Sequence, residues 1–243
     1  MNGKTALVTG GSRGIGAATA VRLAEAGADV VLTYRDGKNE AEGVVRRIEA
    51  LGRKGLALRA DSGDAEEAVG AVRRAAEAFG RLDVLVNNAG LGVLGPLESL
   101  APEDVDRVLA VNVRGVFLAS QTAATLMTAG GRIITIGSCM ADRVPGPGGV
   151  LYAMSKSALT GMTKALAREL GGRGITANIV HPGPIDTDMN PADGPHADAQ
   201  TSLTALGRFG RAEEIASMVA YLAGPEASYV TGARLSVDGG HAA

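Results

Sequence analysis

The 243-residue sequence has few of the residues that carry disulfide, metal or aromatic-stacking chemistry. Its single cysteine, Cys139, cannot form a disulfide within the chain, and we expect a small buried apolar side chain there. Tryptophan is absent and aromatic residues make up only 3%, so the core must be aliphatic. The three histidines, His181, His196 and His241, lack the spacing of metal ligands, and no metal site is predicted.

Charge and hydrophobic runs exclude further classes of protein. The formal net charge is −2, without the strongly basic surface that nucleic-acid binding requires. No apolar run approaches the roughly 18 residues of a membrane span. The first residues also lack the pattern of a signal peptide. We therefore expect a cytoplasmic protein that binds neither nucleic acid nor membrane.

Short β-rich runs alternate with helical patterns along the whole chain. The predicted strands are residues 5–9, 30–33, 55–59, 84–86, 133–136 and 176–180, and the clearest helical stretches are 14–26, 40–51, 65–79 and 215–222. Alternation of this kind predicts βαβ units in a doubly wound α/β fold. Several strands lack period-two alternation, which indicates burial on both faces of a parallel sheet.

One stretch interrupts this regularity. Residues 188–206 are irregular and contain Pro191 and Pro195. We interpret residues 1–243 as a single domain in which 188–206 forms a mobile flap over a binding site.

The stretch TGGSRGIG, residues 9–16, follows the first predicted strand and precedes a helix. Glycines at 10, 14 and 16 allow a tight turn, close approach of the backbone to a diphosphate, and close helix–strand packing. The N-terminus of the helix adds free N–H groups and a partial positive charge. The spacing differs from the commoner G-x-G-x-x-G, but the context predicts a dinucleotide site.

The end of the second strand indicates which nucleotide binds. An acidic residue there would bind the ribose 2′-hydroxyl of NAD, but the sequence places Tyr34 and Arg35 in this region, with Arg13 in the glycine turn. Guanidinium groups without a carboxylate favour a 2′-phosphate, and hence NADP(H). Asp36 keeps NAD(H) as the alternative, since a small shift of register would bring it to the ribose.

The segment YAMSK places Tyr152 and Lys156 four residues apart, on one face of a helix. A free tyrosine, with a pKa near 10, is a poor acid–base catalyst at neutral pH. A neighbouring ammonium favours the phenolate and lowers that pKa.

Taken together, these pieces resemble a short-chain dehydrogenase/reductase over essentially the whole chain. The matching pieces are TGGSRGIG, Asp61, the NNAG of residues 87–90, Asn112 in VNVRG, Ser138 in IGSCM, Tyr152-x-x-x-Lys156, Pro182-Gly183 and the closing YVTGARLSVDGG. The resemblance implies a Rossmann three-layer sandwich with a seven-stranded parallel sheet. It also implies a homotetramer, with YVTGARLSV as edge strand and interface.

The resemblance further implies the roles of the site residues. Tyr152 would exchange a proton with the substrate oxygen, Ser138 would stabilise that oxygen, Lys156 would hold the nicotinamide ribose and lower the pKa of Tyr152, and Asn112 would anchor a water. The cofactor would contact residues of five segments, which are Gly10, Ser12, Arg13, Gly14, Ile15 and Gly16; Tyr34 and Arg35; Asp61 and Ser62; Asn87, Ala89 and Gly90; and Pro182, Gly183, Ile185 and Thr187, besides Tyr152 and Lys156.

The substrate is less constrained by the sequence. Thirteen residues separate Ser138 from Tyr152, where the commonest pattern of the family has twelve, so the mouth of the site differs. Residues 174–207 contain no Lys or Arg but several aspartates, which would repel an acidic carrier protein. We therefore expect reduction of a small neutral ketone or aldehyde. The alternatives are a 3-oxoacyl-ACP reductase and a regulator that binds a cyclic dinucleotide, since parts of the chain resemble a family member linked to biofilm dispersal.

Overall fold

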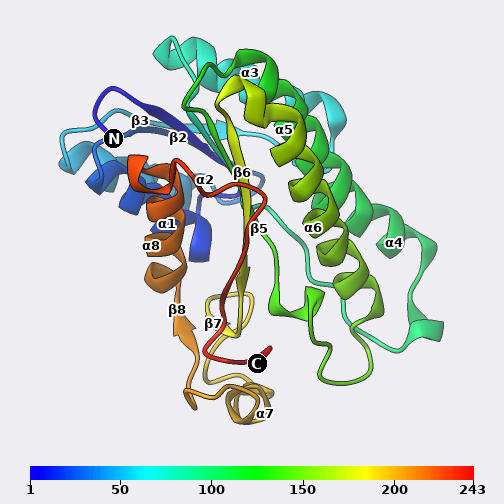
Figure 1. The fold of residues 1–243 in the computed structure, drawn as a ribbon. Coiled ribbons are helices and arrows are strands. Elements are labelled where there is room, and N and C mark those ends of the chain that lie inside the picture. Colours follow the sequence, from blue (N-terminus) through cyan, green and yellow to red (C-terminus); the bar gives the residue numbers. More distant parts are fainter.

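A seven-stranded parallel sheet forms the centre of the computed structural model, which describes residues 1–243 (Figure 1). The strand order is β3-β2-β1-β4-β5-β6-β9, and every neighbouring pair is parallel. The strands are β1 (Thr5–Val8), β2 (Asp29–Tyr34), β3 (Gly55–Arg59), β4 (Val84–Asn87), β5 (Arg132–Ile136), β6 (Thr176–Pro182) and β9 (Arg234–Val237). The predicted doubly wound α/β fold is confirmed.

Helices cover both faces of the sheet (Figure 1). On one face lie α1 (Gly14–Glu25), α2 (Lys38–Ala50) and α8 (Ala212–Ala223). On the other lie α3 (Ala65–Phe79), α4 (Pro102–Leu109), α5 (Val116–Leu126) and α6 (Val150–Leu170). Between α4 and α5 the chain is π-helical over Ala110–Gly115, labelled η2. Short 3₁₀ turns are η1 (Leu97–Ser99), η3 (Cys139–Ala141), η4 (Gly171–Arg173) and η5 (Pro225–Ala227).

The aliphatic composition of the strands explains this layering. Successive side chains of a strand point to opposite faces, so Ala6 and Val8 pack under α1 and α8, whereas Leu7 packs under the other helix layer. Ile134 and Ile133 divide between the two clusters in the same way. Both faces of the sheet are covered by apolar side chains, because the strands do not alternate apolar and polar residues.

The predicted strand boundaries agree with the structure to within two residues, and those of the helices to within three. The inclusion of Thr9 in the first strand was wrong. The Thr9 amide still donates to the carbonyl of Val86 at 3.0 Å, but strand β1 ends at Val8 because the chain turns at Gly10, whose φ is +63°. The Thr9 hydroxyl accepts hydrogen bonds from the amides of Asn88 and Ala89.

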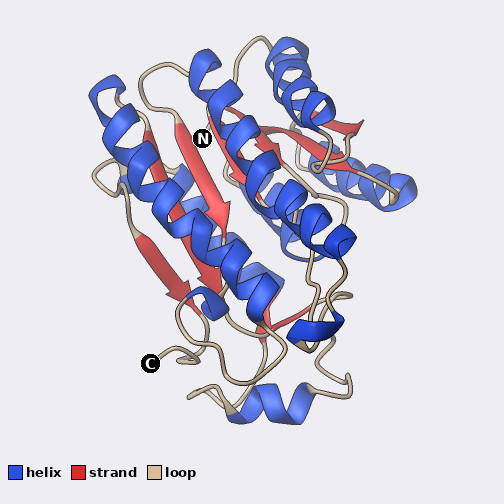
Figure 2. Cartoon of the chain, turned by 90° about the vertical axis from the view of Figure 1, so that its right-hand side faces the viewer, coloured by secondary structure: helices blue, strands red, loops and turns tan.

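Beyond the carboxyl ends of the main strands lies a small substructure (Figures 1 and 2). It contains the two-stranded pair β7 (Ile185–Asp186) and β8 (Gly210–Arg211), and the short helix α7 (Ala197–Ser202). Residues 188–206 are thus less irregular than their sequence indicates, since α7 lies within them. No helix of the molecule is both long and apolar enough to cross a bilayer.

Candidate active site

The glycine turn joins β1 to α1 and presents unpaired backbone donors. No hydrogen bond within the chain uses the amides of residues 12–16, and α1 has neither a side-chain cap nor an acidic residue in its first turn. Gly16 is required for this shape, because a Cβ there would lie 2.2 Å from the carbonyl oxygen of Gly10. The turn therefore leaves several amide donors free at the N-terminus of α1, an arrangement that suits a phosphate group.

Side chains from the neighbouring strands hold the turn in place. Asn88 donates through Nδ2 to the carbonyl oxygens of Thr9 (2.9 Å) and Gly10 (3.0 Å). The Thr33 hydroxyl accepts from the amide of Gly10 at 3.0 Å. The side chains of Thr9, Thr33 and Asn88 brace the glycine turn and the loop beside it, and the sequence motifs did not predict them. Their only signal in the sequence is a polar residue at the end of an apolar strand.

Tyr152 and Lys156 lie on α6, one turn apart as predicted. The ammonium of Lys156 is 5.8 Å from the centroid of the Tyr152 ring and donates to the carbonyl oxygen of Ile136 at 3.1 Å. Burial lowers the pKa of Lys156 to about 8 and raises the pKa of Tyr152 above its ordinary value. The surrounding protein therefore opposes the pKa decrease expected for Tyr152, because loss of solvation disfavours the phenolate.

Ser138 follows β5 and lies beside Tyr152. Its hydroxyl oxygen accepts from the amide of Met140 at 3.2 Å, which leaves the hydroxyl proton available to another acceptor. The nearby hydroxyl also opposes part of the burial-induced rise in the Tyr152 pKa. Both side chains border the carboxyl edge of the sheet, where a carbonyl oxygen could contact them.

Asn112 lies in the π-helical segment and ties three elements together. Its Oδ1 accepts from the amide of Leu91 at 2.8 Å, and its Nδ2 donates to the carbonyl of Leu91 (2.9 Å) and the hydroxyl of Ser155 (3.0 Å). Ser155 in turn donates to the carbonyl of Tyr152 at 2.8 Å. The amide of Asn112 is thus bonded to protein atoms, and the structure gives it a bracing role at the site. Its expected water remains a prediction.

Comparison with known proteins agrees with this geometry. Residues 10–242 match a family model described as "Enoyl-(Acyl carrier protein) reductase". The chain belongs to the short-chain dehydrogenase/reductase family. The expected resemblance is confirmed.

Three relatives show the range of this dehydrogenase/reductase family. A short-chain dehydrogenase from Burkholderia cenocepacia J2315, solved in complex with NADP, is 57% identical, with a TM-score of 0.99 over 100% of this chain and 99% of that one. The cyclic-di-GMP-binding biofilm dispersal mediator protein of Escherichia coli K12 is 49% identical over 98% of this chain and 96% of its own length. A 3-oxoacyl-[acyl-carrier-protein] reductase of Staphylococcus aureus Mu50 is 41% identical, with 98% and 97% covered.

The residues that we predicted to select the nucleotide take part in two ion pairs, Arg35–Asp36 and Asp61–Arg107. Arg35 is half exposed and pairs with Asp36. The guanidinium predicted to bind a 2′-phosphate and the carboxylate that could bind a 2′-hydroxyl instead are therefore in direct contact. Asp61 binds Arg107 of α4, with Oδ2 at 2.7 Å from Nη2, and the amide of Gly63. Burial opposes ionisation of Asp61, but these donors outweigh it and its pKa falls below the usual value. Arg107 belongs to no sequence motif, so its contact with Asp61 was not predicted.

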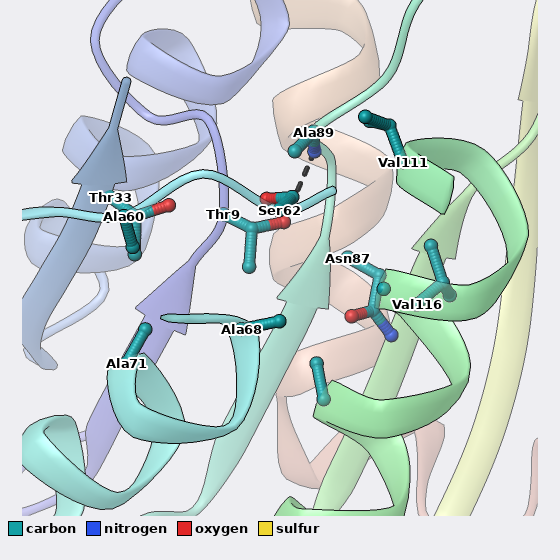
Figure 3. A pocket seen from close by; sticks show the side chains of 12 residues that line it. Thr9, Thr33, Ala60, Ser62, Ala68, Ala71, Asn87, Ala89, Val111 and Val116 are labelled. Carbon is teal, nitrogen blue, oxygen red and sulfur yellow. Dashed lines mark hydrogen bonds between the residues drawn. The ribbon is translucent and has the colours of Figure 1, made fainter. Parts of the chain in front are cut away.

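The side chain of Asn87 points away from the turn, toward α5 (Figure 3). Its Nδ2 donates to the Ser120 hydroxyl at 2.9 Å, and its buried Oδ1 has no protein partner. Asn87 borders a cavity of about 10 Å³ that Ser62 and Ala89 also line, room for roughly one water molecule. Contact between the Asn87 side chain and the cofactor is not visible in this arrangement and stays a prediction.

The remaining predicted residues divide between the turn and the base of the flap. Ser12 and Ile15 are half-buried in the turn, Arg13 is exposed just before α1, and Tyr34 is half-buried at the end of β2. Gly90 lies against the ammonium of Lys156. Gly183 packs on the backbone of Asp238, and its neighbour Pro182 ends β6. Ile185 is buried in the α1/α8 core, and Thr187 lies against Gly14.

Proposed function

We propose that the protein is an NADP(H)-dependent reductase of small neutral ketones or aldehydes. The observation that carries this is the placement of Ser138, Tyr152 and Lys156 at the carboxyl edge of the sheet, where the free amides of residues 12–16 also lie. This combination provides a proton donor, an oxygen ligand and a diphosphate cradle at one edge of the sheet. The NADP in the related Burkholderia structure supports the choice of cofactor.

The residues of the site fit a dinucleotide. The glycine cradle would hold the diphosphate, Arg35 and Arg13 would meet the 2′-phosphate, and Lys156 would hold the nicotinamide ribose. When bound, the cofactor supplies or accepts a hydride. The Arg35–Asp36 ion pair must then exchange or share its partner with the phosphate, because one guanidinium serves both anions.

The chain's own groups perform the proton chemistry. Ser138 donates a hydrogen bond to the substrate oxygen and stabilises the negative charge that develops there. Tyr152 donates its proton to the same oxygen. The ammonium of Lys156, anchored on Ile136, then stabilises the phenolate left on Tyr152. In the reverse direction, Tyr152 removes the proton from an alcohol.

The mouth of the site favours a neutral apolar substrate. The amide of Gly95 donates to the carbonyl of Gly148 at 2.9 Å, which joins the loop of Leu94 to the loop of Val144. Leu94 is 64% exposed and Val144 49% exposed, so apolar surface faces solvent at this junction. Exposed carboxylates lie on β7, at Asp186, and on the flap, at Asp188, Asp193 and Asp198.

A direct comparison of substrates tests the proposal. Oxidation of NADPH is followed with a panel of small ketones, a 3-oxoacyl thioester on acyl carrier protein, and NADH in place of NADPH. We expect the free ketones to be reduced far more efficiently with NADPH. Efficient reduction of the carrier-bound thioester would establish the alternative activity. Absence of any turnover, with tight binding of cyclic di-GMP by calorimetry, would establish the regulatory alternative.

Two further features belong to the same proposal. Residues 188–206 close over bound substrate as a flap, held in part by the paired amides of Asn190 and Gln200 (2.8 and 2.9 Å). The protein forms a homotetramer, in which the fully exposed Tyr229 near β9 becomes buried. Light scattering checks the assembly, and protection of 188–206 from proteolysis by NADPH plus an unreactive substrate analogue checks the flap.

A further inference from the structure

His181 is a completely buried side chain that the mechanism above does not use. It belongs to β6, beside the strand β5 that leads to Ser138. Its Nδ1 lies 2.7 Å from the carbonyl oxygen and 3.1 Å from the amide nitrogen of Ser138. Its Nε2 lies 3.5 Å from the hydroxyl of Thr160 on α6. The ring therefore bridges the strand that ends at Ser138 and the helix that carries Tyr152.

The space for this ring is reserved by the residue before Ser138. A Cβ at Gly137 would lie 2.6 Å from Nδ1 of His181, so only glycine admits the ring at this depth. The amide of Gly137 also donates to Val180 at 2.7 Å, the last ladder bond before the chain turns. After that bond, the orientation of the Ser138 peptide depends on its contact with the imidazole.

We propose that His181 is a positioning residue, which fixes the Ser138 peptide so that the Ser138 hydroxyl faces Tyr152. This inference rests on the proposed reductase function. The Ser138 amide has no hydrogen-bond acceptor other than Nδ1, and a buried unpaired amide is unfavourable. Because the Ser138 side chain branches from the Cα beside this peptide group, a small rotation of the peptide moves the catalytic oxygen.

The imidazole of His181 makes these hydrogen bonds in its neutral form. Asp142, Arg234 and Lys156 are the charged groups that face it, and burial, the dominant influence, lowers the pKa of His181. A neutral Nδ1 either accepts from the Ser138 amide or donates to the Ser138 carbonyl, and Nε2 takes the complementary role toward Thr160. The first form holds the peptide group before Ser138 and the second holds the one after it, so either form restrains the backbone beside the Ser138 Cα.

A double-mutant cycle separates positioning from a merely structural role. His181→Phe keeps a ring but removes both hydrogen bonds, and we expect kcat with a small ketone to fall by about tenfold to a hundredfold. The KM and the Kd for NADPH should stay within about twofold. In a Ser138→Ala background, His181→Phe should produce no further loss, since His181 acts through the Ser138 hydroxyl. If the two substitutions lowered kcat independently, so that their fold-losses multiplied in the double variant, the proposal would be overturned.

Two further variants keep the test decisive if His181→Phe folds poorly. His181→Asn places an amide near the position of Nδ1, and we expect it to retain kcat within about fivefold of the native value. Thr160→Val removes only the outer bond of the ring, and we expect a loss of about threefold that also disappears with Ser138→Ala. A His181→Asn protein as slow as Ser138→Ala would contradict positioning through Ser138.

Titration of Tyr152 provides a readout that needs no turnover. Ser138 lowers the pKa of Tyr152, so its displacement in His181→Phe should raise that pKa, whereas His181→Asn should not. Ultraviolet difference spectra against Tyr152→Phe isolate this titration from the other tyrosines. A protein that reduces no carbonyl but shows this shift would refute the proposed function alone. An active reductase whose Tyr152 titration is unchanged in His181→Phe would refute the inference alone.

Discussion

The buried charged side chains at the two ends of the central sheet differ in the partners that they have. At the amino end, the carboxylate of Asp83 accepts from Lys4 (2.9 Å), Arg81 (2.7 and 2.8 Å) and the amide of Thr5 (2.9 Å). At the carboxyl end, the ammonium of Lys156 donates only to a neutral carbonyl, and the amides of residues 12–16 have no partner. The buried carboxylate at the amino end is neutralised within the chain, whereas the buried ammonium at the carboxyl end is not, although the partly exposed pairs Arg35–Asp36 and Asp61–Arg107 also lie there.

From this difference we expect the amino end of the sheet to contribute to stability and the carboxyl end to contribute to activity. The parallel arrangement brings all the carboxyl ends of the strands to one edge, where loops and helix N-termini meet. The amino ends meet at the opposite edge, near the first residues of the chain, where the amino group of Met1 donates to Ala26 at 2.6 Å. Substitutions at the two edges should therefore have different consequences.

The largest expected effect is at the carboxyl end. Tyr152→Phe removes the proton donor, and we expect kcat to fall by about a thousandfold or more. Because the phenol is not needed to hold the diphosphate, the Kd for NADPH should stay within about twofold, measured by cofactor fluorescence. A variant that retains a tenth of the native kcat would show that Tyr152 is not the acid.

Gly16→Ala should distort the glycine cradle, since the new Cβ would meet the carbonyl of Gly10 at 2.2 Å and Nδ2 of Asn88 at 2.5 Å. We expect NADPH affinity to fall by about a hundredfold because the amides no longer converge on the diphosphate. Gly70→Ala on α3 is the control. A Cβ there meets nothing within 4 Å, so this change should leave affinity intact and raise stability by about 0.5–1 kcal/mol. Equal affinities in both variants would contradict the role assigned to the turn.

At the amino end, Asp83→Asn should lower the free energy of unfolding by about 2 kcal/mol, between the values for exposed and buried ion pairs. Turnover per folded molecule should be unchanged. Calorimetry measures the first effect, and initial rates on the folded fraction measure the second. A large loss of kcat would show that the two edges are coupled.

The same carboxylate predicts a dependence of stability on pH. Burial opposes ionisation of Asp83, but Arg81, the Thr5 amide and Lys4 outweigh it, so its folded pKa lies below the ordinary value. Its contribution is therefore complete above the unfolded pKa of about 3.9 and is lost as the pH falls through the folded pKa. The melting temperature of Asp83→Asn should fall less steeply with acidification than that of the native protein.

The smallest expected effect concerns cofactor choice. Arg35→Ala should weaken NADPH binding by about tenfold and leave NADH binding unchanged, because only NADPH offers a 2′-phosphate. Arg22→Ala is a matched control, since Arg22 is also an exposed, paired arginine but lies on the outside of α1. If NADH and NADPH weaken equally with Arg35→Ala, the guanidinium does not read the phosphate.

The sequence was sufficient to predict the fold and most of the carboxyl edge, because these depend on local patterns. Strand–helix alternation predicted the sheet, and the short motifs around Gly14 and Tyr152 predicted the glycine turn and the neighbouring Tyr152 and Lys156 side chains. The contacts of His181 with Ser138 and of Arg107 with Asp61 join residues more than forty positions apart. No local spacing reports such contacts, since they arise only when different strands and helices pack.

The direction of a side chain was equally hidden from the sequence. Asn87 and Asn88 stand side by side in one motif, yet Asn88 braces the glycine turn while Asn87 bonds to Ser120 on α5. Successive residues at the end of a strand face opposite ways. Only the packed structure shows which of the two side chains contacts the glycine turn.

The π-helical segment that carries Asn112 absorbs one residue more than an α-helix of the same height would hold. Deletion of one residue between 113 and 115 would let the stretch become a continuous α-helix while α4 and α5 keep their present angular relation. We expect such a shortened protein to fold with Arg107 still beside Asp61, but without the wide turn that directs Asn112 toward Leu91.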